Sequence, residues 1–137
     1  MSRFVIAGGA RLSGEIVVEG SKNAVLPILA ASLLNGGVSI IKNCPRLRDV
    51  EVMVEILRKI GCKVEMEDDV ITINSSVIRE TQIPVELAAE MRSSIIFMGP
   101  MLARCGKVTI SYPGGCVTLR KIFVVQRFEK LMYNLSG

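Results

Sequence analysis

The stretch of this sequence best suited to covalent chemistry is Tyr112-Pro113-Gly114-Gly115-Cys116, with Arg120 and Lys121 shortly after it. Glycine lacks the Cβ barrier to tight backbone conformations, so a Pro-Gly-Gly turn can hold Cys116 outside the packed layers. Nearby cations favour the ionised sulfur and lower the pKa of the thiol, which makes it nucleophilic. The alternative is that Cys116 is a small apolar core residue. The residue types leave both interpretations open.

Two other cations, Lys22 and Arg92, fall at the starts of predicted helices. A helix N-terminus carries partial positive charge, so a cation there is unfavourable unless an anion also binds. Free backbone N–H groups together with a cation form a site for phosphate or carboxylate. Either side chain alone could simply extend into water. Their occurrence at equivalent points of a repeat favours an anion site.

The remaining charged and sulfur-containing groups have simpler interpretations. Arg46 and Arg48 flank a helix start and are expected on a solvated face. An acidic cluster is expected at a solvated hairpin tip rather than as an acid/base pair, and a methionine-rich run is expected to pack in the core. The acidic residues are Glu65, Glu67, Asp68 and Asp69, and the methionines are Met91, Met98 and Met101.

The composition describes one domain with an aliphatic core. The chain has 137 residues, of which 50% are hydrophobic and only 4% aromatic, and its net charge of +4 weakly favours anionic partners. Its four cysteines are widely spaced with no C-x-x-C pair, as in a reduced protein rather than a disulfide framework or zinc site. The absence of histidine removes the commonest metal ligand and the Ser-His and Cys-His pairings.

The sequence contains no recognisable membrane or export signal. The longest apolar run, Ala24 to Leu34, is too short to span a bilayer and contains Pro27. Phe4 to Ala7 is too brief for the core of a signal peptide. No membrane partner is therefore expected, and the expected location is cytoplasmic.

Hydrophobic periodicity predicts an α/β protein, in which strands and helices alternate. The hairpin is expected around Asp68-Asp69, and a kink at Gly99-Pro100. The predicted strands are 4–6, 15–19, 38–41, 63–66, 70–73 and 108–112, and the predicted helices run from 20–23 to 34, over 49–60, over 92–104 after a lead-in at 84–89, and through 124–135.

The order of these elements repeats along the chain. Lys22 precedes Val38 by sixteen residues, and Arg92 precedes Val108 by the same sixteen. Asn23 matches Ser93, Gly36 matches Gly106, and a proline follows each strand. The first unit then adds the hairpin, whereas the second stops before its own. A chain built from a repeated unit and ending within one is expected to be truncated in the second unit.

Four motifs resemble, in order and spacing, the UDP-N-acetylglucosamine 1-carboxyvinyltransferases, a family of enolpyruvyl transferases. The resemblance runs from Phe4 to Cys116 and corresponds to about the first third of a family member. The thiol in the Pro-Gly-Gly-Cys loop separates this family from the related shikimate-pathway transferases. The motifs are Gly20-Ser21-Lys22-Asn23-Ala24, Asn43 to Val50, Met91-Arg92-Ser93-Ser94 with Gly99-Pro100, and Pro113-Gly114-Gly115-Cys116.

The resemblance implies transfer of the enolpyruvyl group of phosphoenolpyruvate to the 3′-hydroxyl of UDP-N-acetylglucosamine, the first committed step of peptidoglycan synthesis, with release of phosphate. It implies that Lys22 contacts phosphoenolpyruvate, that Asn23 holds the sugar nucleotide and that Arg92 binds near the phosphate. Cys116 would add covalently to phosphoenolpyruvate and be alkylated by fosfomycin, and Arg120 would correspond to a loop arginine. No metal or organic cofactor is implied.

The resemblance also implies two domains of three βαβαββ units each, in an inside-out α/β barrel. Residues 1–20 would be strands that pack on the second domain, and 21–137 part of the first, catalytic domain. The resemblance weakens over 117–137: Arg120 lies one residue too close to Cys116, and the family's following Pro, Asp and His are absent. An altered tail and an inactive fragment are therefore expected.

Two other functions fit the sequence less well. A non-catalytic α/β interaction module would recruit partners through exposed faces, and self-association is expected in either case. Nucleic-acid binding would depend on Arg120, Lys121, Arg127 and Lys130. These cations are interleaved with apolar positions and lack a stacking platform, so no nucleic-acid partner is expected.

Overall fold

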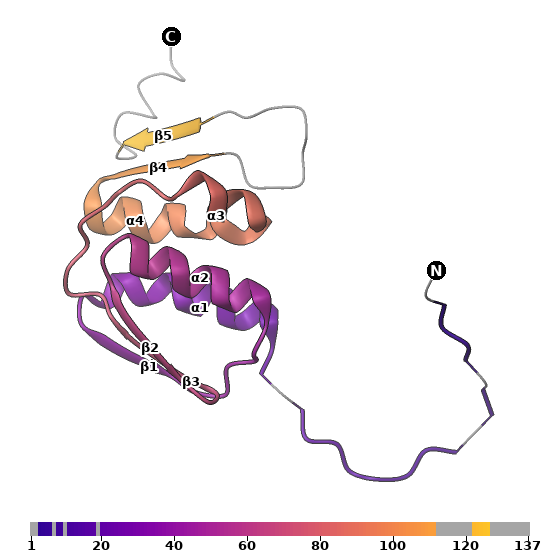
Figure 1. The fold of residues 1–137 in the computed structure, drawn as a ribbon. Helices are drawn as coiled ribbons and strands as arrows, with labels where there is room; N and C mark the ends of the chain where they lie inside the picture. The colour runs from indigo at the N-terminus through magenta and orange to yellow at the C-terminus, as the bar shows by residue number, and fades with distance from the viewer. Residues whose placement is uncertain (1–2, 7, 10, 19, 112–121, 127–137) are drawn as a thin grey trace, which may run out of the picture.

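Four layers make up the body of the protein in the computed structural model, which describes residues 3–6, 8–9, 11–18, 20–111 and 122–126. From bottom to top in Figure 1 these are a three-stranded sheet, helices α1 and α2, a second helical layer, and a two-stranded ribbon. The elements are α1 (Lys22–Asn35), β1 (Val38–Ile41), α2 (Arg48–Lys59), β2 (Lys63–Glu67), β3 (Val70–Asn74), α3 (Val85–Glu90), the 3₁₀ helix η1 (Arg92–Phe97), α4 (Met98–Cys105), β4 (Lys107–Ser111) and β5 (Ile122–Gln126).

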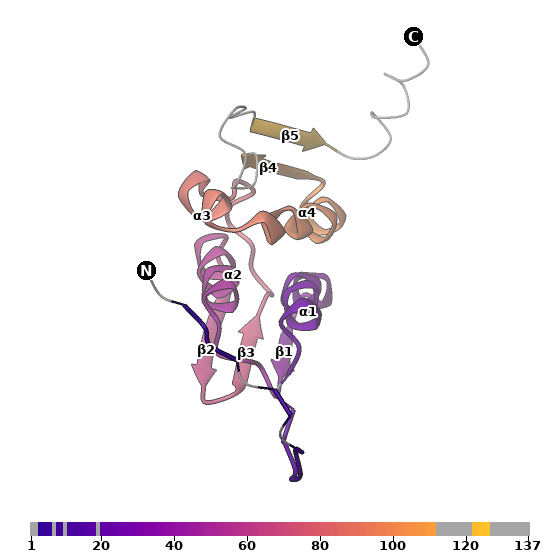
Figure 2. The ribbon, with the colours of Figure 1, turned by 90° about the vertical axis from the view of Figure 1, so that its right-hand side faces the viewer.

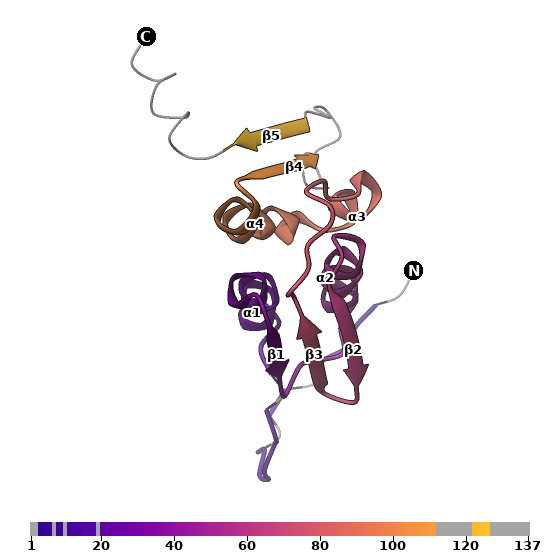
Figure 3. The same cartoon turned by 90° about the vertical axis from the view of Figure 1, so that its left-hand side faces the viewer.

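The three-stranded sheet has the order β1-β3-β2, and both pairings are antiparallel. Strands β2 and β3 form the predicted hairpin, with Glu67 opposite Val70 and Asp68 at φ 48° in the two-residue turn. Ile71 and Ile73 point inward and are almost fully buried. Helices α1 and α2 cover this face of the sheet, as Figures 2 and 3 show from opposite sides.

The predicted repeat is present in the backbone. Helix α1 occupies residues 22–35, and η1 followed by α4 occupies 92–105, an offset of seventy residues (92 − 22). Gly36 and Gly106, which follow these segments, both adopt the left-handed conformation that ends a helix, with φ of 64° and 70°. Strands β1 and β4 then begin at Val38 and Lys107. The two stretches are therefore copies of one helix–turn–strand unit.

The core is aliphatic, as the composition predicts. Buried residues from the two helical layers and from the sheet form one contiguous cluster. Met91 and Met101 are buried and Met98 packs against the cluster, which confirms the expected packing role of the methionine-rich run. The acidic residues of the β2–β3 turn are exposed, as expected for a solvated hairpin tip.

The strands predicted at 4–6 and 15–19 are wrong for the residues described there. These residues form no strand, and Phe4, Ile6 and Val17 are at least 90% exposed. Figure 1 shows the segment running away from the body. A β-strand needs a neighbour for its backbone N–H and C=O groups, and within the described residues none pairs with this segment.

The second helical stretch also differs from its prediction. A separate helix, α3, comes first, and it ends at Met91, whose backbone is extended. The 3₁₀ helix η1 then leads into α4. The change from 3₁₀ to α helix lies at Phe97/Met98, and Gly99-Pro100 falls in the first turn of α4 rather than at a kink. The N–H that proline lacks would have no partner within α4 at this position, so proline is tolerated there.

The helix predicted from residue 124 is wrong over its described part. Residues 122–126 form β5, antiparallel to β4, with Val108 opposite Val125. The run Ile-Phe-Val-Val is rich in β-branched and aromatic residues, which favour a strand when a partner edge is available. The rest of that predicted helix lies outside the described residues.

We expect Gly36→Ala to destabilise the fold by about 1–2 kcal/mol, because an L-residue at φ 64° is strained. A Cβ there would also collide with the Arg104 guanidinium, which donates a hydrogen bond to the Ser75 carbonyl at 3.2 Å. Gly37→Ala is the matched control, since the nearest atom to its Cβ would be 3.7 Å away. Urea unfolding of both variants tests this, and equal midpoints would contradict it.

Candidate functional site

Lys22 is the first residue of α1 and does not extend freely into water. Its Nζ lies 2.7 Å from Oδ2 of Asp49, in the first turn of α2, and the two side chains are 49% and 32% exposed. Asp49 is favourably placed, because a carboxylate stabilises a helix N-terminus. The ion pair therefore joins the starts of two neighbouring helices and fixes the position of the Lys22 ammonium.

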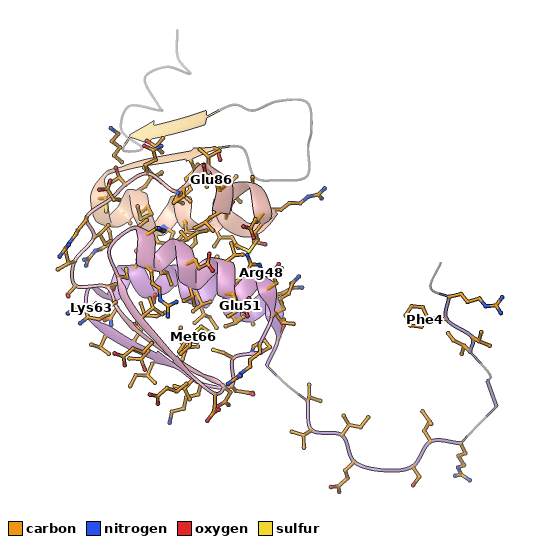
Figure 4. All side chains as sticks on the ribbon, in the orientation of Figure 1. Phe4, Arg48, Glu51, Lys63, Met66 and Glu86 are labelled. Carbon is orange, nitrogen blue, oxygen red and sulfur yellow. The ribbon has the colours of Figure 1, made fainter. Side chains whose placement is uncertain are left out.

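A second ion pair connects this end of α2 to the start of the second repeat. Arg48 donates to Glu90 at 2.8 Å and to Glu51 at 3.4 Å, and Figure 4 shows Arg48 and Glu51 together at one end of α2. The hydrogen bond to Glu90 raises the pKa of the Arg48 guanidinium above its ordinary value. Glu90 ends α3, two residues before Arg92. Arg48 is exposed, as predicted, yet it links α2 to α3.

Lys22 and Arg92 thus begin equivalent helical segments whose starts are joined by these two ion pairs. Arg92 is exposed and forms no ion pair with any residue that the structure describes, and Asn23 is exposed as well. The first turn of α1 has neither an acidic residue nor a capping side chain. This end of the helical layer therefore holds Lys22 and Arg48 in ion pairs with carboxylates, whereas Arg92 is a cation without such a partner among the described residues. An exposed cation beside a helix start is an arrangement that can attract an anion.

Cys116 and Arg120, the other two predicted site residues, lie outside the described residues. The three remaining cysteines are described, and none has the character of an activated thiol. Burial raises the pKa of Cys62 to about 11, against a lowering effect of Arg104. Burial also raises the pKa of Cys44, with a smaller contribution from Asp69, and that of Cys105. All three are therefore less ionised than a free thiol at neutral pH.

The sequence interpretation did not include Asp49 in the site. The available signal was a carboxylate in the first turn of a helix, which alone indicates only a favourable helix terminus.

A separate hollow lies between the start of α1 and the hairpin tip, where Arg46 pairs with Asp68 at 3.4 Å. Its lining residues are Gly20, Asn43, Cys44, Pro45, Arg46, Asp68 and Asp69.

Within the part of the chain that the structure describes, no three His, Cys, Asp or Glu residues lie close enough together to hold a metal ion. None of the helices described combines the length and the apolar character needed to cross a bilayer.

Comparison with protein families gives one match over most of the chain. A family model described as EPSP synthase (3-phosphoshikimate 1-carboxyvinyltransferase) matches residues 6–120. The match includes the starts of both helical repeats and extends through the Pro-Gly-Gly-Cys loop and Arg120.

Similar curated proteins carry the name of an enolpyruvyl transferase. The chain is 53% identical over 116 residues to UDP-N-acetylglucosamine 1-carboxyvinyltransferase 2 of Caldanaerobacter subterraneus subsp. tengcongensis, covering 85% of this chain and 28% of that protein. It is 45% identical over 138 residues to UDP-N-acetylglucosamine 1-carboxyvinyltransferase of Thermotoga maritima, covering 99% of this chain and 33% of that protein. The chain thus spans about a third or less of these relatives, and the second alignment includes the tail.

A solved structure has the same fold. The enolpyruvyl transferase NikO from Streptomyces tendae superposes with a TM-score of 0.65 at 26% identity, covering 74% of this chain and 24% of that one. The predicted α/β class and the predicted repeat of an enolpyruvyl transferase are therefore confirmed for this part of the fold.

Proposed function

The chain belongs to the EPSP synthase family of carboxyvinyl (enolpyruvyl) transferases, and on that premise we propose that it carries part of a site for phosphoenolpyruvate and UDP-N-acetylglucosamine. The reaction of that site transfers the enolpyruvyl group to the 3′-hydroxyl of the sugar nucleotide and releases phosphate, the first committed step of peptidoglycan synthesis. The names of the similar proteins support the sugar nucleotide as acceptor. A cytoplasmic location is part of the same proposal.

The observation that carries this proposal is the joining of the starts of two equivalent cationic helical segments. The Lys22–Asp49 pair connects α1 to α2, and the Arg48–Glu90 pair connects α2 to the residues just before Arg92. Phosphoenolpyruvate carries a phosphate and a carboxylate, and fixed positive charge stabilises the anion that develops during transfer. Neither cation requires a metal ion to act in this way.

Each predicted residue has a role in this proposal. Lys22 contacts phosphoenolpyruvate and stabilises charge on it, and Arg92 binds near its phosphate. Asn23 follows Lys22 in the first turn of α1 and holds the sugar nucleotide. Arg120 serves as the loop cation, and Cys116 is the nucleophile that adds to phosphoenolpyruvate and that fosfomycin alkylates.

We further propose that the chain by itself does not turn over substrate, because a closed, dry site requires more walls than these layers supply. Phosphate release from phosphoenolpyruvate and UDP-N-acetylglucosamine is expected to stay at the level of the protein-free reaction. The Thermotoga maritima relative, assayed in parallel, is the positive control. Substrate-dependent phosphate release by the purified chain would contradict the inactivity and leave the proposed site intact.

A further inference from the structure

Gly20 lies two residues before Lys22 and packs closely on the connection between β1 and α2. A Cβ at Gly20 would collide with the carbonyl oxygen of Asn43, and it would lie 3.1 Å from the carbonyl carbon of Asn43 and 3.3 Å from Cδ of Pro45. The φ angle of Gly20 is not positive, so other residues could adopt its backbone conformation. The close approach of two segments of main chain is therefore what requires glycine here.

The atoms that a side chain at Gly20 would meet are held in place. Two of the three are main-chain atoms, and the third belongs to a proline ring. The connection is anchored to the sheet, because the N–H of Cys44 donates to the Asp69 carbonyl at 2.8 Å, and Cys44 and Pro45 are both buried. A side chain at Gly20 would therefore displace the segment that carries it rather than the connection.

That segment leads directly into the first turn of α1. The Ser21 carbonyl accepts hydrogen bonds from the N–H groups of Ala24 and Val25, at 3.1 and 3.0 Å. The connection between β1 and α2 continues into the first turn of α2, which holds Asp49, the ion-pair partner of Lys22. The backbone of Lys22 is thus placed against the same connection that leads to the carboxylate holding its ammonium.

We propose that Gly20 is a positioning residue for Lys22. Because Gly20 has no Cβ, the start of α1 docks on the Asn43 carbonyl, and this contact sets the position of the Lys22 backbone, while Asp49 holds the ammonium at 2.7 Å. An ammonium has three N–H donors, so Lys22 can keep its bond to Asp49 and still donate to a phosphate or carboxylate. The inference rests on the proposed function, since the anion placed beside Lys22 is the phosphorylated acid of that site.

Gly20→Ala tests the contact without changing any charge, and Gly8→Ala is the matched control, because a Cβ at Gly8 would meet no atom within 4 Å. In Gly20→Ala the amides of Ala24 and Val25 should exchange with deuterium at least about threefold faster, because the first turn of α1 is displaced. The amide of Leu29, in the middle of α1, should keep its protection, and Gly8→Ala should change none of the three. Unchanged exchange at Ala24 and Val25 would overturn the proposal. Faster exchange at Leu29 as well would overturn it too, since Gly20 would then support the whole fold.

Recruitment of an anion by Lys22 is the second readout. Gly20→Ala should slow alkylation of Cys116 by fosfomycin at least about threefold, because a misplaced cation binds the phosphonate less well. Alkylation by iodoacetamide, which is neutral, should stay unchanged. Lys22→Met removes the cation and should slow fosfomycin at least as much as Gly20→Ala does.

The two variants separate the positioning role of Gly20 from the proposed function. If Lys22→Met slows fosfomycin and Gly20→Ala does not, the positioning role is wrong and the proposed function stands. If Gly20→Ala slows both reagents equally, it acts on the thiol or on folding, and the positioning role is again wrong. If neither variant slows fosfomycin, the proposed function fails, and the positioning role fails with it.

Discussion

Fosfomycin should alkylate Cys116 before Cys44, Cys62 and Cys105. The proposed site brings cations near the thiol loop, which favours both an ionised sulfur and the binding of a phosphonate. The other thiols are disfavoured by their surroundings. Cys44 and Cys62 are 6% and 5% exposed, and Cys105 is partly buried. Mass spectrometry of a brief labelling reaction would identify the modified cysteine.

The expected selectivity over Cys62 can be estimated from ionisation. At pH 8 a thiol with an ordinary pKa of about 8.5 is roughly one-quarter thiolate, whereas a thiol whose pKa is about 11 has about a thousandth of its population ionised. Since the thiolate is the nucleophile, Cys116 should react about tenfold or more faster than Cys62, because the difference in thiolate population outweighs the greater intrinsic nucleophilicity of the thiolate with the higher pKa. Equal labelling of all four thiols would contradict an activated Cys116.

Two controls separate activation of the sulfur from recruitment of the anion. Iodoacetamide is neutral and reports thiol reactivity alone, whereas fosfomycin also reports binding of its phosphonate. Lys22→Met should therefore slow labelling by fosfomycin while leaving labelling by iodoacetamide unchanged. If both reagents slowed equally, Lys22 would act on the thiol or on folding rather than on the anion. If neither slowed, Lys22 would have no place in the proposed site.

Periodicity predicted those elements whose partners lie close in the sequence. The stripe over 49–60 became α2, and the alternation around Asp68-Asp69 became the β2–β3 hairpin. The repeat was detectable because Gly36 and Gly106 end equivalent helices, a role that local backbone conformation decides. Residues 4–6 and 15–19 have strand-like sequences too, but whether a strand forms depends on a partner edge elsewhere.

The candidate site was only partly predictable for a similar reason. The sequence shows that Lys22 and Arg92 are cations at helix starts, where positive charge is unfavourable, because this feature depends on each helix alone. Asp49 is missing from that interpretation because its contact with Lys22 spans twenty-seven residues (49 − 22) and depends on how α1 packs on α2. Equally, no local pattern shows that Ala24 is exposed while its equivalent, Ser94, is buried.

Phe97→Ala should cause the largest loss of stability among single substitutions in the second repeat. Phe97 has no exposed surface and lies where η1 passes into α4, at the joint between the two helical layers. Truncation of a buried phenylalanine costs about 3–5 kcal/mol, from lost burial and from the cavity that remains. Domains of this size are stable by only about 5–15 kcal/mol, so a large part of the stability depends on this side chain.

Phe4→Ala provides the matched control, since the same atoms are removed from a side chain that is 97% exposed. Its expected effect on the free energy of unfolding is within about 0.5 kcal/mol of zero. Urea titrations followed by circular dichroism would measure both variants. Similar midpoints for the two would mean that Phe97 does not contribute the core packing that its complete burial indicates. A low midpoint for Phe97→Ala alone would show that the second repeat belongs to the same stabilising core as α1 and the sheet.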